Sequence, residues 1–501
     1  MLAAVEAAAR QGAELVALPE LVVTGYPPRD LLLDPAFVER ALRVTDEIAG
    51  ELAAGPPVVL GTLARSGREV PGHPGLLDAA AWLEGGRVLD LAGKRLLPSY
   101  DVFHETRWFV PGGPSRPRPA AGHSVGLLVC EDLWDEGYPL RPSAELAAAG
   151  AQLLVCLSSS PYRAGVREKR LHHGRRAGRP LAYVNAVGAN DELVFDGGSF
   201  VLDAEGRLVA ELPRFEEAVE VVDLDGGGRL SPRLAPEEEL FSALALGVRD
   251  FAAKNGLARA WLGLSGGVDS ALVACVAAQA LGPRAVTALA LPSRHSDPRS
   301  TETGRELAAS LGIGFEELDL EPLCDAARAR LAALLDGTPE ADVADENLQA
   351  RLRALVLTAH VNRHGGLLLN TSNKTELSLG YGTLYGDLAG TLSVIGDLTK
   401  PQVYALARWY ARERRPIPAF ILERPPSAEL RPGQVDPFDY PVVAPLVEAL
   451  VQGTPPPPAP DLEAWRRRLR SSEHKRFQHG IILKVSEKAF GTGRMVPMTR
   501  V

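Results

Sequence analysis

The chain has 501 residues, 46% of them hydrophobic and 23% charged, with a formal net charge of −9. This length exceeds what one hydrophobic core supports, so we expect two or three domains, and the acidic balance argues against a nucleic-acid-binding protein. The four cysteines lack CxxC spacing, no secretory signal begins the chain and no apolar run approaches the ~18 residues that span a membrane, so we expect a cytoplasmic protein with no membrane partner.

In the first half, short apolar runs alternate with helical stretches. Residues 2–11 have the pattern of an amphipathic helix that ends at Gly12, and a strand is expected at Glu14–Leu18. Turn residues at 84–87 and 204–207 predict hairpins, and further strands are expected at Val58–Gly61, Val125–Val129, Leu153–Leu157 and Leu181–Asn185. Helical crossovers mixed with hairpins predict a mixed sheet, or two sheets packed together with helices outside.

A break in this pattern separates the two halves. Three glycines at 226–228 precede Pro232 and Pro236, which predicts a domain at 1–225, a linker at 226–236 and a second domain at 237–501 that ends in a short basic tail segment. After the linker come a helix, a strand (Ala260–Leu264), a glycine turn, a helix (Ser270–Leu281) and a strand (Ala285–Leu291). This βαβ order predicts a parallel, doubly wound sheet.

The loop Ser265-Gly266-Gly267-Val268-Asp269-Ser270 has the features of a phosphate-binding site. Glycines let backbone N–H groups converge on an anion, and the following helix N-terminus adds its positive dipole. The serine hydroxyls add donors, whereas Asp269 makes sense only as a ligand of Mg²⁺ held against the phosphates. A capped glycine turn is the alternative, but the complete SGGxDS string between a strand and a helix disfavours it. The loop resembles that of the ATP pyrophosphatases, which cleave ATP between its α- and β-phosphates.

A second turn, Leu369–Glu376, also follows an expected strand and leads into a helix. The carboxyl ends of strands in an open α/β sheet face one crevice, so we expect Glu376 to share a metal with Asp269. Taken alone, the N-K-T-E turn at 373–376 is more typical of a capping box with Glu at N3.

Six segments then give the second half a specific resemblance. They are SGGVDS, DENLQAR (345–351), TSNKTELSLGYGTLYGD (371–387), LTKPQVYALARW (398–409), RPPSAELRPGQ (424–434) and HKR (474–476). In this order they resemble the NAD synthetase family over nearly all of residues 237–501. The resemblance implies that the SGGVDS loop, Thr371 and Lys400 bind ATP, and that deamido-NAD is bound by Asn347, Arg351, Glu376 and Lys475.

Three separated segments of the first half carry residues that suit amide hydrolysis. Glu20 and Cys130 each end an apolar strand, and Lys94 follows another. Hydrolysis through a thioester needs a thiolate, a base active near neutrality and a cation for the oxyanion, and these residues supply one of each. Lys94 should also favour the thiolate. Taken singly, a cysteine after an apolar strand is usually core and a lysine is usually solvated.

Together these residues resemble the Glu-Lys-Cys triad of the nitrilase superfamily. The likeness extends through PELVVTGYPPRDLL (19–32), KRLLPSYDVFHETRWFVPG (94–112), VCEDLW (129–134), SSSPY (158–162) and DELVFDGGS (191–199). These forms are typical of the glutaminase domain of glutamine-dependent NAD synthetases. They imply that Tyr100, Glu131 and Ser160 bind glutamine, with Arg167 a further candidate nearby. Cys156 lies in mid-strand and is expected in the core.

The two resemblances imply an α/β protein. Its N-terminal domain would be a nitrilase-like α-β-β-α sandwich, and its C-terminal domain a Rossmann-like, doubly wound parallel sheet of the ATP pyrophosphatase type. Family members begin with a strand before the helix seen at 2–11. The sandwich is therefore expected to have its first strand missing, either because the start codon is assigned too late or because the strand is lost.

The expected reaction is the amidation of deamido-NAD to NAD. ATP and Mg²⁺ would form an adenylate, and glutamine would supply ammonia along a protected route. By the resemblance we expect a homo-oligomer. Another amide-transfer or thiolation enzyme with the same loop, acting on a nucleotide or a tRNA, is one alternative. A tRNA substrate is disfavoured because neither a strongly basic surface nor CxxC pairs are present. A non-catalytic scaffold is another, disfavoured because Glu20, Lys94 and Cys130 are all retained.

Overall fold

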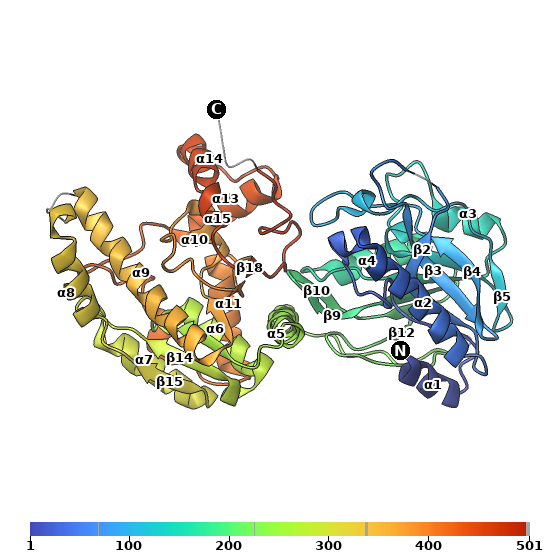
Figure 1. The fold of residues 1–501 in the computed structure, drawn as a ribbon, viewed down its shortest axis with the longest axis horizontal. Coiled ribbons are helices and arrows are strands. Elements are labelled where there is room, and N and C mark those ends of the chain that lie inside the picture. The colour runs from blue at the N-terminus through green and yellow to red at the C-terminus, as the bar shows by residue number, and fades with distance from the viewer. Residues whose placement is uncertain (69, 225, 336–338, 497–501) are drawn as a thin grey trace. The chain divides into compact units, whose positions relative to one another are not determined.

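The computed structural model describes residues 1–68, 70–224, 226–335 and 339–496, without the side chains of 339–341. The chain forms two compact units (Figure 1), Met1–Asn190 with Val194–Leu234 and Asp191–Leu193 with Ala235–Val501. Among the described residues, no helix is long and apolar enough to cross a membrane.

The first unit is built on two larger sheets. One has the order β1 (Val16–Ala17), β2 (Val58–Arg65), β3 (Leu76–Glu84) and β4 (Arg87–Gly93). The other has the order β12 (Leu208–Glu211), β11 (Phe200–Leu202), β8 (Leu181–Asn185), β7 (Leu153–Ser158), β6 (His123–Val129) and β5 (Arg118–Ala120). The strands β9 (Val187–Asn190) and β10 (Leu193–Asp196) form a separate pair. Each of the larger sheets combines parallel and antiparallel pairs, as predicted.

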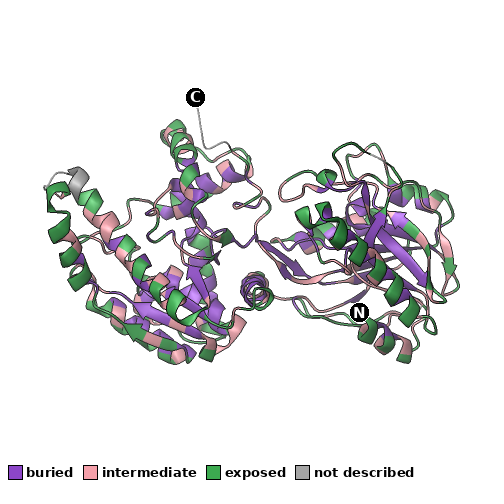
Figure 2. Ribbon diagram, in the orientation of Figure 1, coloured by how far each residue is buried: buried purple, intermediate pink, exposed green. Residues whose placement is uncertain are grey.

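Apolar side chains on both faces of each sheet make this unit four layers deep. Between the sheets, residues such as Val59 and Trp82 pack with Val129 and Val155. Helices α1 (Leu2–Arg10) and α2 (Pro35–Glu51) cover the outer face of the first sheet, and α3 (Pro142–Ala148) and α4 (Val166–Arg176) cover that of the second. Because both faces are covered, the central strands β2 and β7 are buried along nearly their whole length (Figure 2). The predicted α-β-β-α layers are confirmed, and Cys156 lies in the core.

The second unit is organised around one parallel sheet. Its order is β15 (Gly314–Glu317), β14 (Val286–Ala290), β13 (Ala260–Gly263), β16 (Leu367–Asn370), β17 (Leu392–Ser393) and β18 (Ile481–Ile482), and every pair is parallel. The chain enters the sheet at β13, continues outward through β14 to β15, and then returns to β16 on the other side of β13. This confirms the doubly wound sheet and places its topological switch point between β13 and β16.

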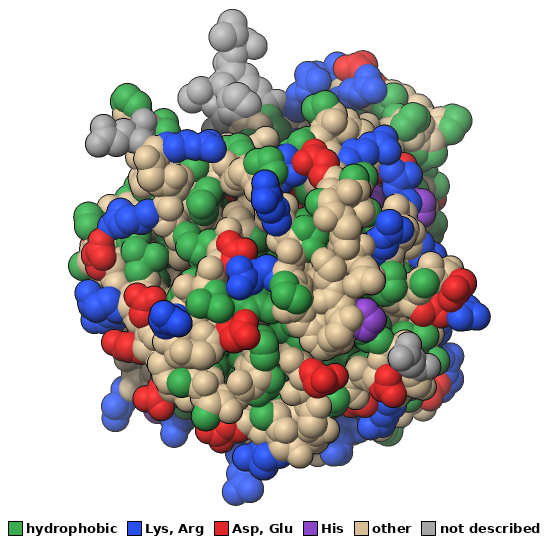
Figure 3. Space-filling view, turned by 90° about the vertical axis from the view of Figure 1, so that its right-hand side faces the viewer, with side chains coloured by type: hydrophobic (Ala, Val, Ile, Leu, Met, Phe, Trp, Pro, Cys, Tyr) green, Lys and Arg blue, Asp and Glu red, His purple; other side chains and the backbone are tan. Residues whose placement is uncertain are grey.

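Helices pack around this sheet. The buried α6 (Val268–Leu281) packs against β13, β14, α5 (Pro236–Lys254) and α11 (Lys400–Glu413). An apolar cluster joins the face that bears Trp261 and Leu368 to α8 (Glu321–Arg330) and α9 (Pro339–His364). The remaining helices are α7 (Pro298–Leu311), α10 (Lys374–Leu379), α12 (Ala419–Glu423), α13 (Tyr440–Gln452), α14 (Leu462–Ser471) and α15 (Glu473–Arg476). On the face drawn in Figure 3, basic and acidic side chains are interspersed.

Candidate active sites

The first unit holds a buried lysine surrounded by carboxyl groups. Lys94 Nζ lies 2.7 Å from Oε1 of Glu20 and 2.7 Å from Oε1 of Glu105. It also lies 3.5 Å from Oδ2 of Asp78, and all four residues are buried. Burial alone would lower the pKa of Lys94, but the charges of Glu105 and Glu20 raise it above its ordinary value. The lysine is therefore a fixed cation, and these four residues are called the Lys94 cluster below.

Cys130 lies directly after β6, at the start of the short 3-10 helix Cys130–Leu133, with a φ of +43°. The left-handed region costs an L-residue about 1–2 kcal/mol, so the surrounding fold holds this cysteine in place. Ser158 Oγ donates a hydrogen bond to Cys130 Sγ at 3.2 Å, and the next residue, Ser159, donates its N–H to Glu20 Oε2 at 2.6 Å. The end of β7 thus aligns the thiol with the Glu20 carboxylate.

Burial and the charge of Glu20 raise the pKa of Cys130, and Lys94 lowers it only in part. The expected pull of Lys94 toward a thiolate is therefore outweighed in the free protein. The thiol therefore keeps its proton in the free protein, beside the carboxylate of Glu20.

Glu20 reaches the cluster because β2 carries a glycine at the point of closest approach. A Cβ on Gly61 would lie 2.2 Å from the backbone N of Leu21 and 2.5 Å from Cα of Glu20. Gly61 N donates to the carbonyl oxygen of Pro19 at 3.1 Å, which fixes the chain at this approach. Leu21 itself has a φ of +44°.

Two members of the cluster, Asp78 and Glu105, are absent from the sequence prediction. Asp78 lies inside the otherwise apolar run LLDAAAWL, where a lone acidic residue is a signal in itself. Glu105 lies within the segment 94–112 that resembles the nitrilase superfamily. Burial raises the pKa of Glu105 to about 7, against the attraction of Lys94, and Tyr26 OH donates to Glu105 at 2.8 Å.

Tyr100 and Glu131, two of the predicted glutamine ligands, lie together. Tyr100 OH donates to both carboxylate oxygens of Glu131, at 3.1 and 3.0 Å, and Tyr138 OH donates to one of them at 3.0 Å. Burial raises the pKa of Glu131, opposed by the charge of Lys94. Because Glu131 is buried and Tyr100 is 51% exposed, the pair connects the cluster with the surface.

Ser160 and Arg167 have different partners. Ser160 accepts a hydrogen bond at Oγ from the buried Arg170, at 3.3 Å, and donates its N–H to Asn185 Oδ1 at 2.9 Å. Arg167 donates through Nε and Nη2 to Glu211, at 2.6 and 2.7 Å. Its guanidinium is therefore engaged by a carboxylate, and neither contact joins it to the Lys94 cluster.

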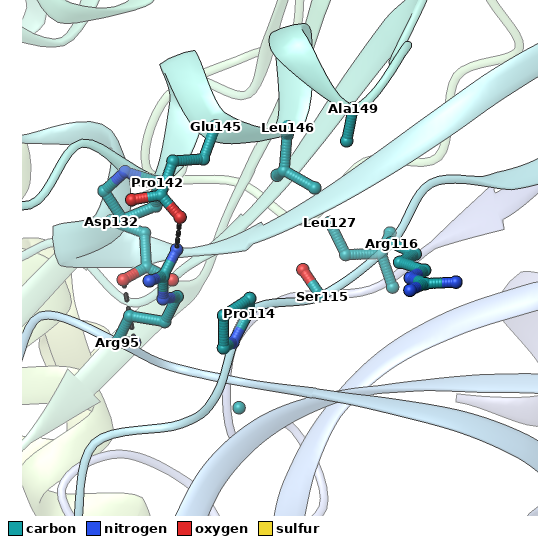
Figure 4. A pocket seen from close by; sticks show the side chains of 11 residues that line it. Arg95, Pro114, Ser115, Arg116, Leu127, Asp132, Pro142, Glu145, Leu146 and Ala149 are labelled. Atoms are coloured by element: carbon teal, nitrogen blue, oxygen red, sulfur yellow. Dashed lines mark hydrogen bonds and ion pairs between the residues drawn. The ribbon is translucent and has the colours of Figure 1, made fainter.

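Asp132 ties the segment of Lys94 to the segment of Cys130. Its Oδ1 accepts from the N–H groups of Arg95 and Leu96, both at 2.9 Å, and its Oδ2 accepts from Val129 N at 3.2 Å. Burial raises the pKa of Asp132 to about 6, against these three backbone donors. Asp132 and Arg95 also line a cavity of about 220 Å³ in which Arg95 Nη1 donates to Glu145 at 2.6 Å (Figure 4).

In the second unit, the SGGVDS loop joins β13 to α6 as predicted. Gly266 has a φ of +71°, and a Cβ there would lie 2.5 Å from the carbonyl oxygen of Ser300, so the position requires glycine. Ser265 N donates to Ser270 Oγ at 3.3 Å. All loop residues except Gly266 line a cleft of about 470 Å³, which also takes in the ends of β13 and β16. The cleft thus opens at the topological switch point, where ligands of such sheets bind.

Asp269 and Glu376 face the same cation in this cleft. Lys400 Nζ donates to Asp269 Oδ2 at 2.6 Å and to Glu376 Oε1 at 3.1 Å, and Asn373 Nδ2 donates to Asp269 Oδ1 at 2.9 Å. Burial raises the pKa of Glu376 to about 7, opposed by Lys400. Asn373 and Glu376 also form the capping box that their spacing predicts. Two carboxylates aimed at one point are hard oxygen donors, so this donor set fits Mg²⁺.

The other predicted ligands of the second unit divide into two groups. Thr371, Asn347 and Lys475 line the cleft, and Lys475 Nζ donates to the carbonyl oxygens of Gly380 and Gly382 at 2.8 and 2.7 Å. Arg351 is exposed, donates to a backbone carbonyl oxygen and is not among the described residues that line the cleft.

Two arginines that were not predicted do line the cleft. Arg353 lies one turn of α9 beyond Gln349 and donates to the carbonyl oxygen of Leu291 at 3.1 Å. Arg424 donates to Ser300 Oγ at 2.6 Å. Arg424 opens the segment RPPSAELRPGQ, so its position was available from the sequence, whereas Arg353 had no motif to mark it.

Comparisons with known proteins match both units. The family model of carbon-nitrogen hydrolases matches residues 1–229, and that of NAD synthases matches residues 240–456. The glutamine-dependent NAD(+) synthetases of Synechocystis sp. and Rhodobacter capsulatus are 38% and 39% identical to the chain, each over 99% of this chain and 94% of its own length. The structure of the glutamine-dependent NAD+ synthetase from Acinetobacter baumannii in complex with ADP is 30% identical, with a TM-score of 0.78 over 99% of this chain and 94% of that chain.

The two folds and the two sites define a carbon-nitrogen hydrolase fused to an NAD synthase. Relatives with both parts match the chain over nearly its whole length. The chain belongs to the family of glutamine-dependent NAD(+) synthetases. A structure from Cytophaga hutchinsonii, 21% identical with a TM-score of 0.84 over 100% of this chain and 94% of that chain, shares the fold.

Proposed function

We propose that this protein is a ligase that converts deamido-NAD to NAD, using ATP and the amide nitrogen of glutamine. One observation carries the proposal. A single chain holds both the site of Glu20, Lys94 and Cys130 and the cleft at the SGGVDS loop, where the topological switch point of the sheet lies. One site suits the release of ammonia from an amide, and the other suits the activation of a carboxylate by ATP.

In the first unit, Cys130 is the nucleophile. Glu20 takes the thiol proton as sulfur attacks the glutamine amide carbon, and Lys94 stabilises the negative charge that develops on the amide oxygen. Glu20 then passes the proton to the leaving nitrogen, which departs as ammonia and leaves a thioester. Water activated by Glu20 hydrolyses the thioester to glutamate and restores the thiol. Glu105 accepts a hydrogen bond from Lys94 Nζ and keeps Lys94 charged throughout the reaction.

Glutamine is recognised at the same cluster. Glu131 with Tyr100 offers a carboxylate and a hydroxyl to the polar end of the substrate, and Ser160 offers a hydroxyl. Arg167 remains a proposed contributor, although in the free protein Glu211 occupies its guanidinium.

In the second unit, the carboxylate of deamido-NAD attacks the α-phosphate of ATP and pyrophosphate leaves. Backbone N–H groups and hydroxyls of residues 265–270, together with Thr371 and Lys400, bind the phosphates. Mg²⁺ held by Asp269 and Glu376 would neutralise charge on the pyrophosphate. Asn347, Arg351, Glu376 and Lys475 bind the dinucleotide, and ammonia displaces AMP to form the amide.

We assign these two half-reactions to residues 1–225 and 237–501, joined by the linker at 226–236. We further propose that the protein acts in the cytoplasm as a homo-oligomer.

The test is NAD formation from deamido-NAD with either glutamine or ammonium as nitrogen source. Cys130→Ala should abolish the glutamine reaction and leave the ammonium reaction unchanged. Cys156→Ala is the matched control, because Cys156 is a buried cysteine that the mechanism does not use, and it should retain both reactions. A Cys130→Ala protein that still used glutamine but no longer used ammonium would reverse the assignment of the two units.

A further inference from the structure

The Lys94 cluster contains an acid for which the reaction has no use. Asp78 lies within β3, which pairs on one side with β2 and on the other with β4. The neighbours of Asp78 in the strand are Leu77 and Ala79, and its residue exposure is 1%. A buried carboxylate is costly unless it is paired and hydrogen-bonded, so its charge state needs an explanation.

The cluster holds more acid than one lysine can neutralise. One carboxylate oxygen each from Glu20, Asp78 and Glu105 lies within 4.8 Å of the others, and Lys94 is the cation among them. Carboxyl groups that share a buried site do not all ionise, because like charges repel strongly there. At least one of the three therefore carries a proton at neutral pH.

Hydrogen bonding decides which acid that is. Glu20 accepts from Lys94 Nζ and from Ser159 N, and Glu105 accepts from Lys94 Nζ and from Tyr26 OH. Neither oxygen of Asp78 accepts a hydrogen bond from any described residue, and its distance of 3.5 Å to Lys94 is the longest of the three.

The pKa of Asp78 also identifies it as the acid that carries the proton. Burial and the charge of Glu20 raise it well above its usual range, although Lys94 lowers it. The nearest carboxylate oxygens of Asp78 and Glu20 lie within 4.8 Å of each other. Two carboxyl groups can share a hydrogen bond only if one of them carries the proton.

We infer that Asp78 is a neutral positioning residue, whose carboxyl O–H donates to Glu20 and holds that carboxylate toward Cys130. The inference rests on the proposed role of Glu20 as the base. With Asp78 neutral, the cluster contains Lys94 with Glu20 and Glu105, and Glu20 remains free to take the thiol proton. Ionisation of Asp78 at alkaline pH would add a negative charge beside Glu20 and draw Lys94 toward it. The proton of Asp78 stays in place during turnover.

The test uses Asp78→Asn in the full-length protein, because asparagine has the size of the neutral acid and its amide N–H can donate to Glu20. We expect kcat for glutamine within about twofold of wild type and an unchanged KM. Activity should also persist to higher pH than in wild type. Asp78→Ala removes the donor and should lower kcat about 10-fold or more with little change in KM.

Stability provides a readout that does not depend on catalysis. At neutral pH the wild-type Asp78 has to take up a proton on folding, which costs more as the pH rises, whereas asparagine does not. The melting temperature of Asp78→Asn should exceed that of wild type by about 2–4 °C near neutrality, and this gain should vanish at acidic pH. Asp90→Asn is the matched control, a half-buried aspartate on the neighbouring strand β4 that pairs with Arg118 at 3.5 Å, and should show no such gain.

The two proposals fail in different ways. If the wild-type protein did not hydrolyse glutamine, the proposed function would fail, and the melting experiment would still test Asp78. The inference would be overturned if Asp78→Asn failed to fold or was less stable than wild type. It would also be overturned if Asp78→Asn lost kcat while Asp78→Glu retained kcat. Either result would make Asp78 an anionic partner of Lys94.

Discussion

Substitution of Gly61 by alanine tests how closely the fold holds the proposed base. The new Cβ would lie 2.2 Å from the backbone N of Leu21, so the chain at Glu20–Leu21 has to move by about 1.2 Å to reach an ordinary contact of 3.4 Å. A displacement of about 1 Å at a catalytic group costs on the order of 100-fold in rate. Overpacking of this kind also costs roughly 1–3 kcal/mol of stability.

The assay compares glutamine-driven and ammonium-driven NAD formation in the same preparation. Gly61→Ala should reduce the glutamine reaction about 100-fold and leave the ammonium reaction intact. Gly50→Ala is the control, because a Cβ there meets nothing within 4 Å and the residue lies inside α2. It should keep both reactions and gain roughly 0.5–1 kcal/mol of stability. Full glutamine activity in Gly61→Ala would refute either the tight approach at Gly61 or the role of Glu20.

Three further outcomes are expected. Lys400→Met should lower NAD formation with either nitrogen source by about 100-fold, because Asp269 and Glu376 would lose their shared cation and ATP a phosphate ligand; an effect on glutamine alone would contradict this. The apparent affinity for Mg²⁺ in the ammonium reaction should rise as the pH passes through about 7, where the buried Glu376 ionises, and Glu376→Gln should remove that dependence. Arg170→Met should destabilise the first unit by about 3–5 kcal/mol in urea unfolding, because the buried Asp196 would lose one of its two arginine partners. A change below about 1 kcal/mol would mean that Arg214 alone compensates the charge of Asp196.

The layers and the loop positions could be predicted because they depend on local pattern. The strand Leu181–Asn185 has the predicted bounds, since Pro180 precedes its short apolar run and the polar Asn185 ends it. The SGGVDS loop and the capping box at 373–376 were likewise readable from short segments. Cys130 could be placed at a strand end because apolar residues stop there.

The composition of the Lys94 cluster could not be predicted in the same way. Asp78 joins it only because β3 pairs with β4 in a register that brings Ala79 opposite Gly93, one residue before Lys94. Such pairings depend on long-range packing, which short patterns do not encode. Arg167 shows the reverse case: its sequence position is close to Ser160, yet Glu211 on β12 binds its side chain.

The contacts of Asp132 have a consequence for how the first site responds to disturbance. This one carboxylate accepts N–H groups from the segment after Lys94 and from the residue before Cys130, so it ties the two chain segments together. Thermal motion or a substitution in the cavity beside Arg95 would therefore shift nucleophile and lysine together, and their separation would change little (Figure 4). Glu20 follows β1, and its side chain joins the site by accepting from Lys94 Nζ at 2.7 Å and from Ser159 N at 2.6 Å. Side-chain hydrogen bonds thus hold the base to its partners, whereas backbone N–H groups hold the segments of the nucleophile and the lysine to each other.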